Sequence, residues 1–169
     1  DATKTVAHKS KIWPVVNFAF GNFGHSALSM MFGTYFMIYV TTAMFTGVSK
    51  SQATKSIAMI TGLIFVLRIL EIFIDPIIGN IVDNTNTRWG RFKPWLIGAG
   101  TVSALLLIVL MSGIFGLSRS NTTWFMVLFI PIFTIFDIFY SFRDVSYWGM
   151  IPASVSYTHL RAHETLANL

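Results

Sequence analysis

The chain has 169 residues, of which 54% are hydrophobic and only 11% are charged. A soluble domain carries about 25% charged residues, and a chain of this size needs polar side chains to cover its surface. The composition therefore excludes an ordinary soluble enzyme and a disordered chain. The net charge of +5 does not indicate a nucleic-acid partner, because the cations are scattered between apolar blocks.

Four apolar blocks follow one another along the chain, and each exceeds the ~20 residues that cross a bilayer as a helix. The predicted spans are about 13–45, 54–83, 94–117 and 123–152. Strand-like alternation of apolar and polar residues, which a transmembrane barrel requires, does not occur. The sequence therefore predicts an all-α polytopic membrane protein, with residues 1–12 preceding the first span.

Prolines and capping residues mark the ends of these blocks. Pro94 stands at a first-turn position of the third span, where its missing N–H has no helical partner to lose. Asn121 or Thr122 is the expected N-cap of the fourth span. Pro131 removes one backbone donor and is expected to bend that helix.

The cations are distributed unequally between the two sides of the predicted bundle. Six lie in the N-terminal segment and in the connection 83–93, namely Lys4, Lys9, Lys11, Arg88, Arg91 and Lys93. Three lie in the other two connections, namely Lys50, Lys55 and Arg119. Because positive residues are enriched in cytoplasmic loops, we expect residues 1–12 and the connection 83–93 to be cytoplasmic.

Six ionisable residues lie within or at the ends of the second and fourth spans, where each costs roughly 2.5–3.5 kcal/mol to insert. They are Arg68, Glu71, Asp75, Asp137, Arg143 and Asp144. At about 100° per residue, most of them fall on one narrow arc of each helix. The first polar stripe consists of Arg68, Glu71 and Asp75, and the second of Asp137, Ser141, Asp144 and Trp148. Arg143 projects roughly 100° away from Asp144. We expect the two stripes to face a shared interior.

The chemistry of the stripes admits two interpretations. Carboxylate and hydroxyl oxygens suit a hard cation such as Na⁺, and carboxylates also carry H⁺. A Trp ring beside a carboxylate suits a sugar, because the ring packs on C–H groups and the carboxylate accepts from hydroxyls. In the alternative interpretation, the charges neutralise one another and only hold the helices together. The pair Arg68 and Glu71 fits that alternative.

Three separated motifs resemble one known family. Residues 79–95 (GNIVDNTNTRWGRFKPW) resemble the cytoplasmic loop of the glycoside–pentoside–hexuronide:cation symporters, a family of the major facilitator superfamily. Residues 71–76 (EIFIDP) are similar to that family's second helix, and residues 137–144 (DIFYSFRD) to its fourth. The resemblance covers about residues 17–153 and is greatest to the lactose/raffinose and xyloside permeases of Gram-positive bacteria.

The resemblance implies roles for single residues. It implies cation binding by Glu71, Asp75 and Ser141, the last at a position where the melibiose permease of this family has a Thr ligand. It implies sugar binding by Ser26, Asp144 and Trp148. It implies a cytoplasmic gate loop that depends on Gly79, Asp83, Arg88, Gly90 and Arg91.

Two departures from the family pattern bear on these roles. Family members often have an Asp that contacts the sugar where this chain has Ser26, so the resemblance does not fix the identity of the sugar. Ile74 replaces an Asn that stands beside the cation-binding acids of the melibiose permease. The coupling ion is therefore left open between Na⁺ and H⁺, and no other cofactor or metal is expected.

The superfamily uses twelve helices in two halves, with the substrate held between them. With four predicted spans, the chain corresponds to about the N-terminal third of such a transporter. The resemblance implies a multi-pass protein of the bacterial plasma membrane whose partners are a sugar, the lipid bilayer and the missing C-terminal part of the same protein. It implies no enzymatic reaction and no nucleic acid. An alternative is a small four-helix membrane scaffold without transport activity.

The polar stretch 154–169 does not continue the membrane pattern. It resembles the spurious tails of truncated reading frames, so we predict that it is not native and assign it no function.

Overall fold

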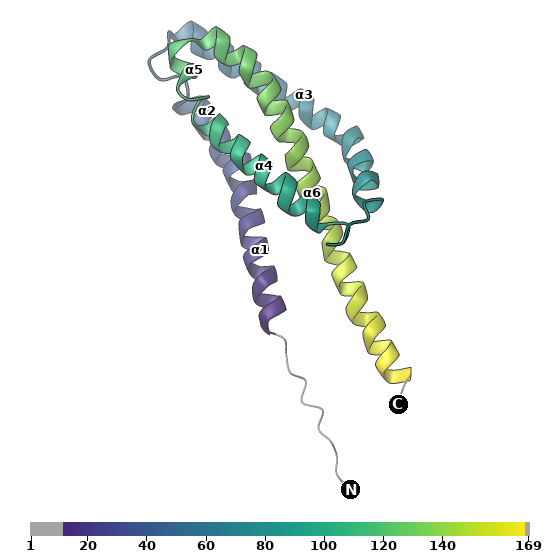
Figure 1. The fold of residues 1–169 in the computed structure, drawn as a ribbon. Helices are drawn as coiled ribbons and strands as arrows, with labels where there is room; N and C mark the ends of the chain where they lie inside the picture. Colours follow the sequence, from purple (N-terminus) through teal and green to yellow (C-terminus); the bar gives the residue numbers. More distant parts are fainter. Residues whose placement is uncertain (1–11, 168–169) are drawn as a thin grey trace. The chain divides into compact units, whose positions relative to one another are not determined.

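A computed structural model describes residues 12–167. The helices in chain order are α1 (Ile12–Met30), η1 (Met31–Phe36), α2 (Met37–Thr42), α3 (Lys50–Asp83), α4 (Lys93–Met111), α5 (Leu117–Ser120) and α6 (Thr122–Ala167), as Figure 1 shows. No strand occurs within this range, which confirms the all-α prediction. Residues 1–11 of the predicted N-terminal segment and residues 168–169 of the predicted tail lie outside the described residues.

The chain divides into two units, Asp1–Ile38 and Tyr39–Leu169. In the first unit, α1 continues directly into η1, which is a π-helix, a form with i→i+5 hydrogen bonds. The rings of Phe32 and Phe36 lie 6.1 Å apart and are both buried. The helical run of α1, η1 and α2 ends at Thr42, three residues before the expected boundary at 45.

Three helical segments of the described chain are long and apolar enough to cross a membrane. They are Lys50–Asp83, Lys93–Met111 and Thr122–Ile151. This confirms the polytopic membrane class but not the count of four spans. The expected first span is absent from this set, because its helical run contains a π-helix and α1 carries polar residues such as Asn17, Asn22 and His25.

Helix α6 is the centre of the second unit, since it packs against α3, α4 and α5. Its buried face is a row of four fully buried rings, Phe125, Phe129, Phe133 and Phe136. Their spacing of four, four and three residues places them on one side of the helix. Successive centroids lie 5.4, 5.3 and 5.8 Å apart, so the rings form a continuous apolar spine along α6.

Two boundaries of α4 follow from local backbone chemistry. Pro94 lies in its first turn, as predicted. The helix ends at Met111, six residues before the expected boundary at 117. The four residues 113–116 all have positive φ, two of them being glycines, and this left-handed stretch cannot continue a right-handed helix.

Helix α6 begins where the sequence predicts and continues further than the sequence predicts. The Asn121 side chain accepts a hydrogen bond from the Trp124 backbone N–H at 3.2 Å, which confirms Asn121 as the cap. The membrane-length segment Thr122–Ile151 agrees with the predicted span 123–152. The helical backbone then extends to Ala167 through the stretch predicted to be non-native.

Candidate functional site

Arg68 joins the two polar stripes. Its Nη1 donates to both carboxylate oxygens of Glu71, at 3.0 and 2.7 Å, one turn further along α3. Its Nη2 lies 3.9 Å from Oδ1 of Asp137 on α6. The Arg68 side chain is 45% exposed, whereas those of Glu71 and Asp137 are 14% and 7% exposed. One cation therefore compensates two shielded carboxylates that come from different helices.

A second contact joins the stripes directly. The buried Ser141 hydroxyl on α6 donates to Oε1 of Glu71 on α3 at 3.5 Å. Together with the Arg68–Asp137 pair, this contact confirms that the two stripes face one another.

Asp75 lies one turn beyond Glu71 on the same stripe and interacts electrostatically with Ser141, Asp144 and Arg68. Its Oδ1 is buried and accepts no hydrogen bond within the described part of the chain. The next residue, Pro76, has no N–H, so the Ile72 carbonyl loses its usual helical donor. This turn of α3 therefore presents Oδ1 of Asp75 as a carboxylate oxygen without a hydrogen bond, and oxygen is the ligand that a hard cation prefers.

The residues implied in sugar binding are more accessible than this cluster. The Asp144 side chain is 35% exposed, with its Oδ1 3.9 Å from Nη2 of Arg143. Trp148 follows Asp144 by one turn and is 60% exposed, with its ring packed edge-on against Tyr147 at 5.5 Å. A half-exposed carboxylate beside an exposed indole can accept from hydroxyls while the ring face packs on C–H groups.

Arg143 points toward α4 rather than along the stripe of Asp144. Its Cδ and Cγ lie 3.6 and 3.7 Å from the position that a Cβ of Gly100 would occupy. Its guanidinium lies 4.6 Å from the centroid of the Tyr140 ring, and the residue is 5% exposed. The buried cation is therefore accommodated by the bare backbone of α4 and by an aromatic face.

Ser26, the remaining residue implied in sugar binding, belongs to the first unit. It lies on α1 with an exposed side chain. Its hydroxyl is therefore accessible within that unit.

The predicted gate loop connects α3 and α4. Arg91 Nη1 lies 3.6 Å from Oδ1 of Asp83, and both side chains are exposed. The loop turns at Gly90, where φ is +91° and a residue without a Cβ is favoured. Thr87 Oγ1 donates to the Gly90 carbonyl at 2.6 Å, and Arg88 is exposed.

Gly79 of the same motif lies on α3 before the loop. A Cβ at this position would lie 3.9 Å from Cγ1 of Val145 on α6, an ordinary contact distance. Gly79 therefore lies beside α6, one helical turn after Asp75 on α3.

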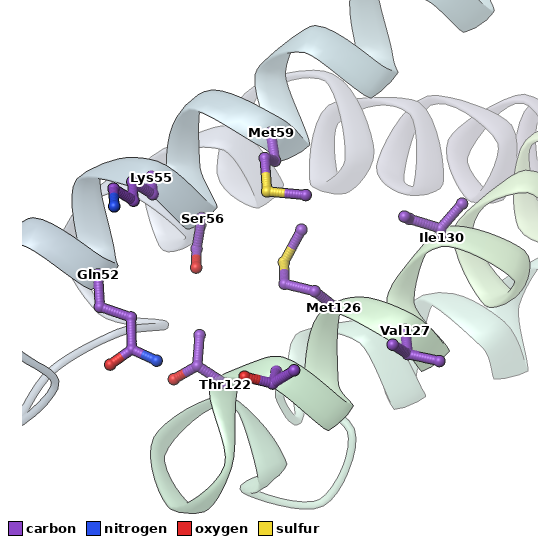
Figure 2. Close-up of a pocket in the computed structure, with 9 residues that line it drawn as sticks. Gln52, Lys55, Ser56, Met59, Thr122, Met126, Val127 and Ile130 are labelled. Carbon is purple, nitrogen blue, oxygen red and sulfur yellow. The ribbon is translucent and has the colours of Figure 1, made fainter.

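A pocket of about 330 Å³ lies between the N-terminal parts of α3 and α6 (Figure 2). It is lined by Gln52, Lys55, Ser56, Met59, Thr122, Thr123, Met126, Val127 and Ile130. None of the residues predicted to bind a cation or a sugar contributes to it. Across the described residues, no group of three or more His, Cys, Asp or Glu side chains is arranged to hold a metal ion.

Comparison with known proteins identifies the family to which the chain belongs. The model of the family described as MFS/sugar transport protein matches residues 17–162. The chain belongs to this sugar transport family. The match covers all three membrane-length segments and runs nine residues past the expected boundary at 153.

Several relatives of this transporter family are closely similar to the chain. The lactose permease of Leuconostoc lactis is 50% identical over 153 residues, which are 90% of this chain and 24% of that protein. The lactose permease of Lactobacillus helveticus is 52% identical over 86% of this chain and 23% of its own length. The raffinose carrier protein of Pediococcus pentosaceus is 38% identical over 80% of this chain and 21% of its own length. The chain thus spans about a quarter of these relatives, and no solved structure matches it.

Two contacts in the structure go beyond what helical spacing predicts for these residues. Asp137 stood on the second stripe, but its pairing with Arg68 depends on how α3 and α6 approach each other. Trp95 stacks on Phe142 at 4.5 Å, a contact between helices that spacing along the chain does not predict. Phe92 packs on Gly149 of α6. The sequence offered a signal for this contact, because a glycine inside a helix often marks a close approach of another segment.

Proposed function

We propose that the longer protein to which this chain belongs is a sugar:cation symporter. The observation that carries this proposal is the joining of the two stripes, through Ser141 to Glu71 at 3.5 Å and Arg68 to Asp137 at 3.9 Å. Ionisable residues inside a membrane are costly, and they commonly mark an ion or substrate pathway. Membership of a sugar transport family supports the same function.

In this proposal the coupling cation, Na⁺ or H⁺, binds among Glu71, Asp75 and Ser141. Glu71 and Ser141 are already in contact, and Asp75 contributes the buried Oδ1 that accepts no hydrogen bond in the described structure. Arg68 compensates part of the negative charge while the cation is absent. No further cofactor or metal is proposed.

The sugar in this proposal is a glycoside, an oligosaccharide or a pentoside, and Asp144 and Trp148 bind it. Ser26 of the first unit is a further residue that we propose for sugar binding. The exposed Trp148 ring and the half-exposed Asp144 carboxylate supply the packing surface and the acceptor. The relatives named lactose permease and raffinose carrier protein support an oligosaccharide among these sugars.

The remaining parts of the proposed transporter complete the cycle. The loop residues Gly79, Asp83, Arg88, Gly90 and Arg91 form the cytoplasmic gate. The protein spans the bacterial plasma membrane with a cytoplasmic N-terminus, as the charge distribution predicts. Alternating access requires the part of the protein that lies beyond this chain, and the chain itself performs no enzymatic reaction.

The proposal is tested with the full-length protein reconstituted in lipid vesicles. Labelled lactose and raffinose are supplied under an inward Na⁺ gradient, an inward H⁺ gradient or neither. Accumulation above the external concentration under one gradient, abolished by the matching ionophore, is the expected result. A folded protein that accumulates neither sugar under either gradient would overturn the proposal and favour a scaffold.

A further inference from the structure

Trp95 connects both ends of the loop 84–92 to α6. It lies in the first helical turn of α4, and its ring stacks on Phe142 of α6 at 4.5 Å with an interplanar angle of 18°. Its indole Nε1 donates to Thr85 Oγ1 at 3.0 Å, two residues after the end of α3. One side chain therefore connects the start of the loop, the start of α4 and the middle of α6.

Phe92 makes a second contact between the loop and α6. A Cβ at Gly149 would lie only 2.9 Å from Cε1 of Phe92, so the ring packs directly on the bare backbone of α6. Any side chain larger than hydrogen at position 149 displaces this ring or the helix. The contact thus depends on glycine.

The two contacts lie on one face of α6. Phe142 and Gly149 are seven residues apart, which is about two turns of a helix. The proposed ligand residues Ser141, Asp144 and Trp148 occupy neighbouring positions over the same two turns. A displacement of this part of α6 therefore moves the contact points of Trp95 and Phe92, because packed rings transmit displacement rather than absorb it.

We propose that Trp95 and Phe92 are positioning residues that couple the loop 84–92 to α6, so that sugar binding on α6 changes the position of the gate loop. The proposal rests on the proposed transport function. Figure 1 shows the loop as the connection between α3 and α4, beside α6. The loop carries Arg91, whose pairing with Asp83 would be made or broken by such a movement.

The test uses the full-length protein with a cysteine at the exposed position 86 and with any cysteine beyond this chain replaced by serine, since this chain has none. A nitroxide label on Asn86→Cys reports the mobility of the loop by its electron paramagnetic resonance line shape. Addition of lactose is expected to change the wild-type spectrum. Trp95→Leu, which removes the stack and the hydrogen bond, is expected to raise the mobility and to abolish the change. Trp95→Phe keeps a stacking ring and is expected to restore most of the coupling.

Gly149→Ala and Gly98→Ala form a matched pair. Gly98 lies on α4, and a Cβ there meets nothing within 4 Å, so Gly98→Ala should leave the label unchanged. Gly149→Ala should loosen the loop as Phe92→Ala does, and the double variant should be no looser than Phe92→Ala alone. If the increases in label mobility caused by Gly149→Ala and Phe92→Ala add up in the double variant, the contact between Phe92 and Gly149 does not hold the loop. The double variant has no Phe92 ring to clash with the new Cβ at position 149, so the test remains valid where Gly149→Ala alone fails to fold.

Transport kinetics distinguish a positioning role of Trp95 from a role in binding the sugar. In Trp95→Leu the maximal uptake rate should fall about tenfold while the sugar KM stays within about twofold. An unchanged spectrum and rate in Trp95→Leu, in a protein that transports, would overturn the coupling. A loosened loop in a protein that never transports would leave the loop contact in place and overturn the proposed function instead.

Discussion

Arg68 holds Glu71 on its own helix through two hydrogen bonds, at 2.7 and 3.0 Å, and reaches Asp137 on α6 at 3.9 Å. The same guanidinium thus serves a local pair and an interhelical pair. Arg68 is thus shared between two shielded carboxylates that come from different helices. In the proposed symporter, the coupling cation would bind beside this shared pair.

Removal of the shared cation should weaken the packing of α3 on α6. Arg68→Met leaves Glu71 and Asp137 without their partner, and we expect a loss of about 1–2 kcal/mol, below the 3–5 of a fully buried pair because Arg68 is half-exposed. Thermal unfolding in detergent measures this loss. Adding Asp137→Asn should recover part of it, whereas Lys50→Met at the exposed start of α3 should have little effect. An equal loss of stability in Arg68→Met and Lys50→Met would contradict the role of the shared cation.

Asp75 is expected to be essential for coupling but not for sugar binding. Asp75→Asn removes the charge of a carboxylate whose Oδ1 is buried and accepts no hydrogen bond in the described residues. Accumulation driven by the cation gradient should fall to the level of empty vesicles, while exchange of sugar at equal concentrations continues. Uptake assays under the two conditions separate these outcomes. Normal sugar accumulation in Asp75→Asn would contradict a coupling role and indicate that Asp75 is only structural.

The exposed ring of Trp148 should contribute to sugar affinity. Trp148→Ala removes the packing surface beside Asp144, and we expect the sugar KM to rise about tenfold, with a smaller rise in Trp148→Phe. Trp124 is similarly exposed at the start of α6 and serves as the matched control. A larger effect of Trp124→Ala than of Trp148→Ala on KM would contradict a sugar contact at Trp148.

The ion pair of the loop should act through its charges. Asp83 and Arg91 are exposed at 3.6 Å, so either single neutralisation should change stability by less than about 1 kcal/mol. We nevertheless expect Asp83→Arg and Arg91→Asp each to slow transport strongly, and the double exchange to recover much of the rate. Initial uptake rates of the three variants test this. Failure of the double exchange to recover any transport would indicate that the pair is not the working contact.

Helical spacing predicted the stripes because side chains three and four apart on a helix share a face whatever surrounds them. The Arg68–Glu71 pair and the contact between the stripes of α3 and α6 could therefore be predicted from the sequence. The capping of α6 by Asn121 and the position of Pro94 in the first turn of α4 follow from equally local chemistry.

The contacts that fix the loop were not predictable in the same way. Trp95 stands near a span end, where a lipid-interface role is the ordinary expectation. Its stacking on Phe142 and the packing of Phe92 on Gly149 depend on the distance between helices, which periodicity does not supply. The early end of α4 has a different cause, since the non-glycine residues Ile114 and Phe115 adopt positive φ against their intrinsic preference.

In the proposed symporter, the stripes of α3 and α6 form one cation site that is coupled to the sugar. The most direct measurement is the affinity of the full-length protein for lactose by calorimetry, with and without saturating Na⁺ and at two pH values. Because coupling between two ligands is reciprocal, one of these cations should tighten sugar binding by about fivefold or more, and Glu71→Gln should abolish the tightening. Sugar affinity that is independent of both cations, or unchanged cation dependence in Glu71→Gln, would contradict the account.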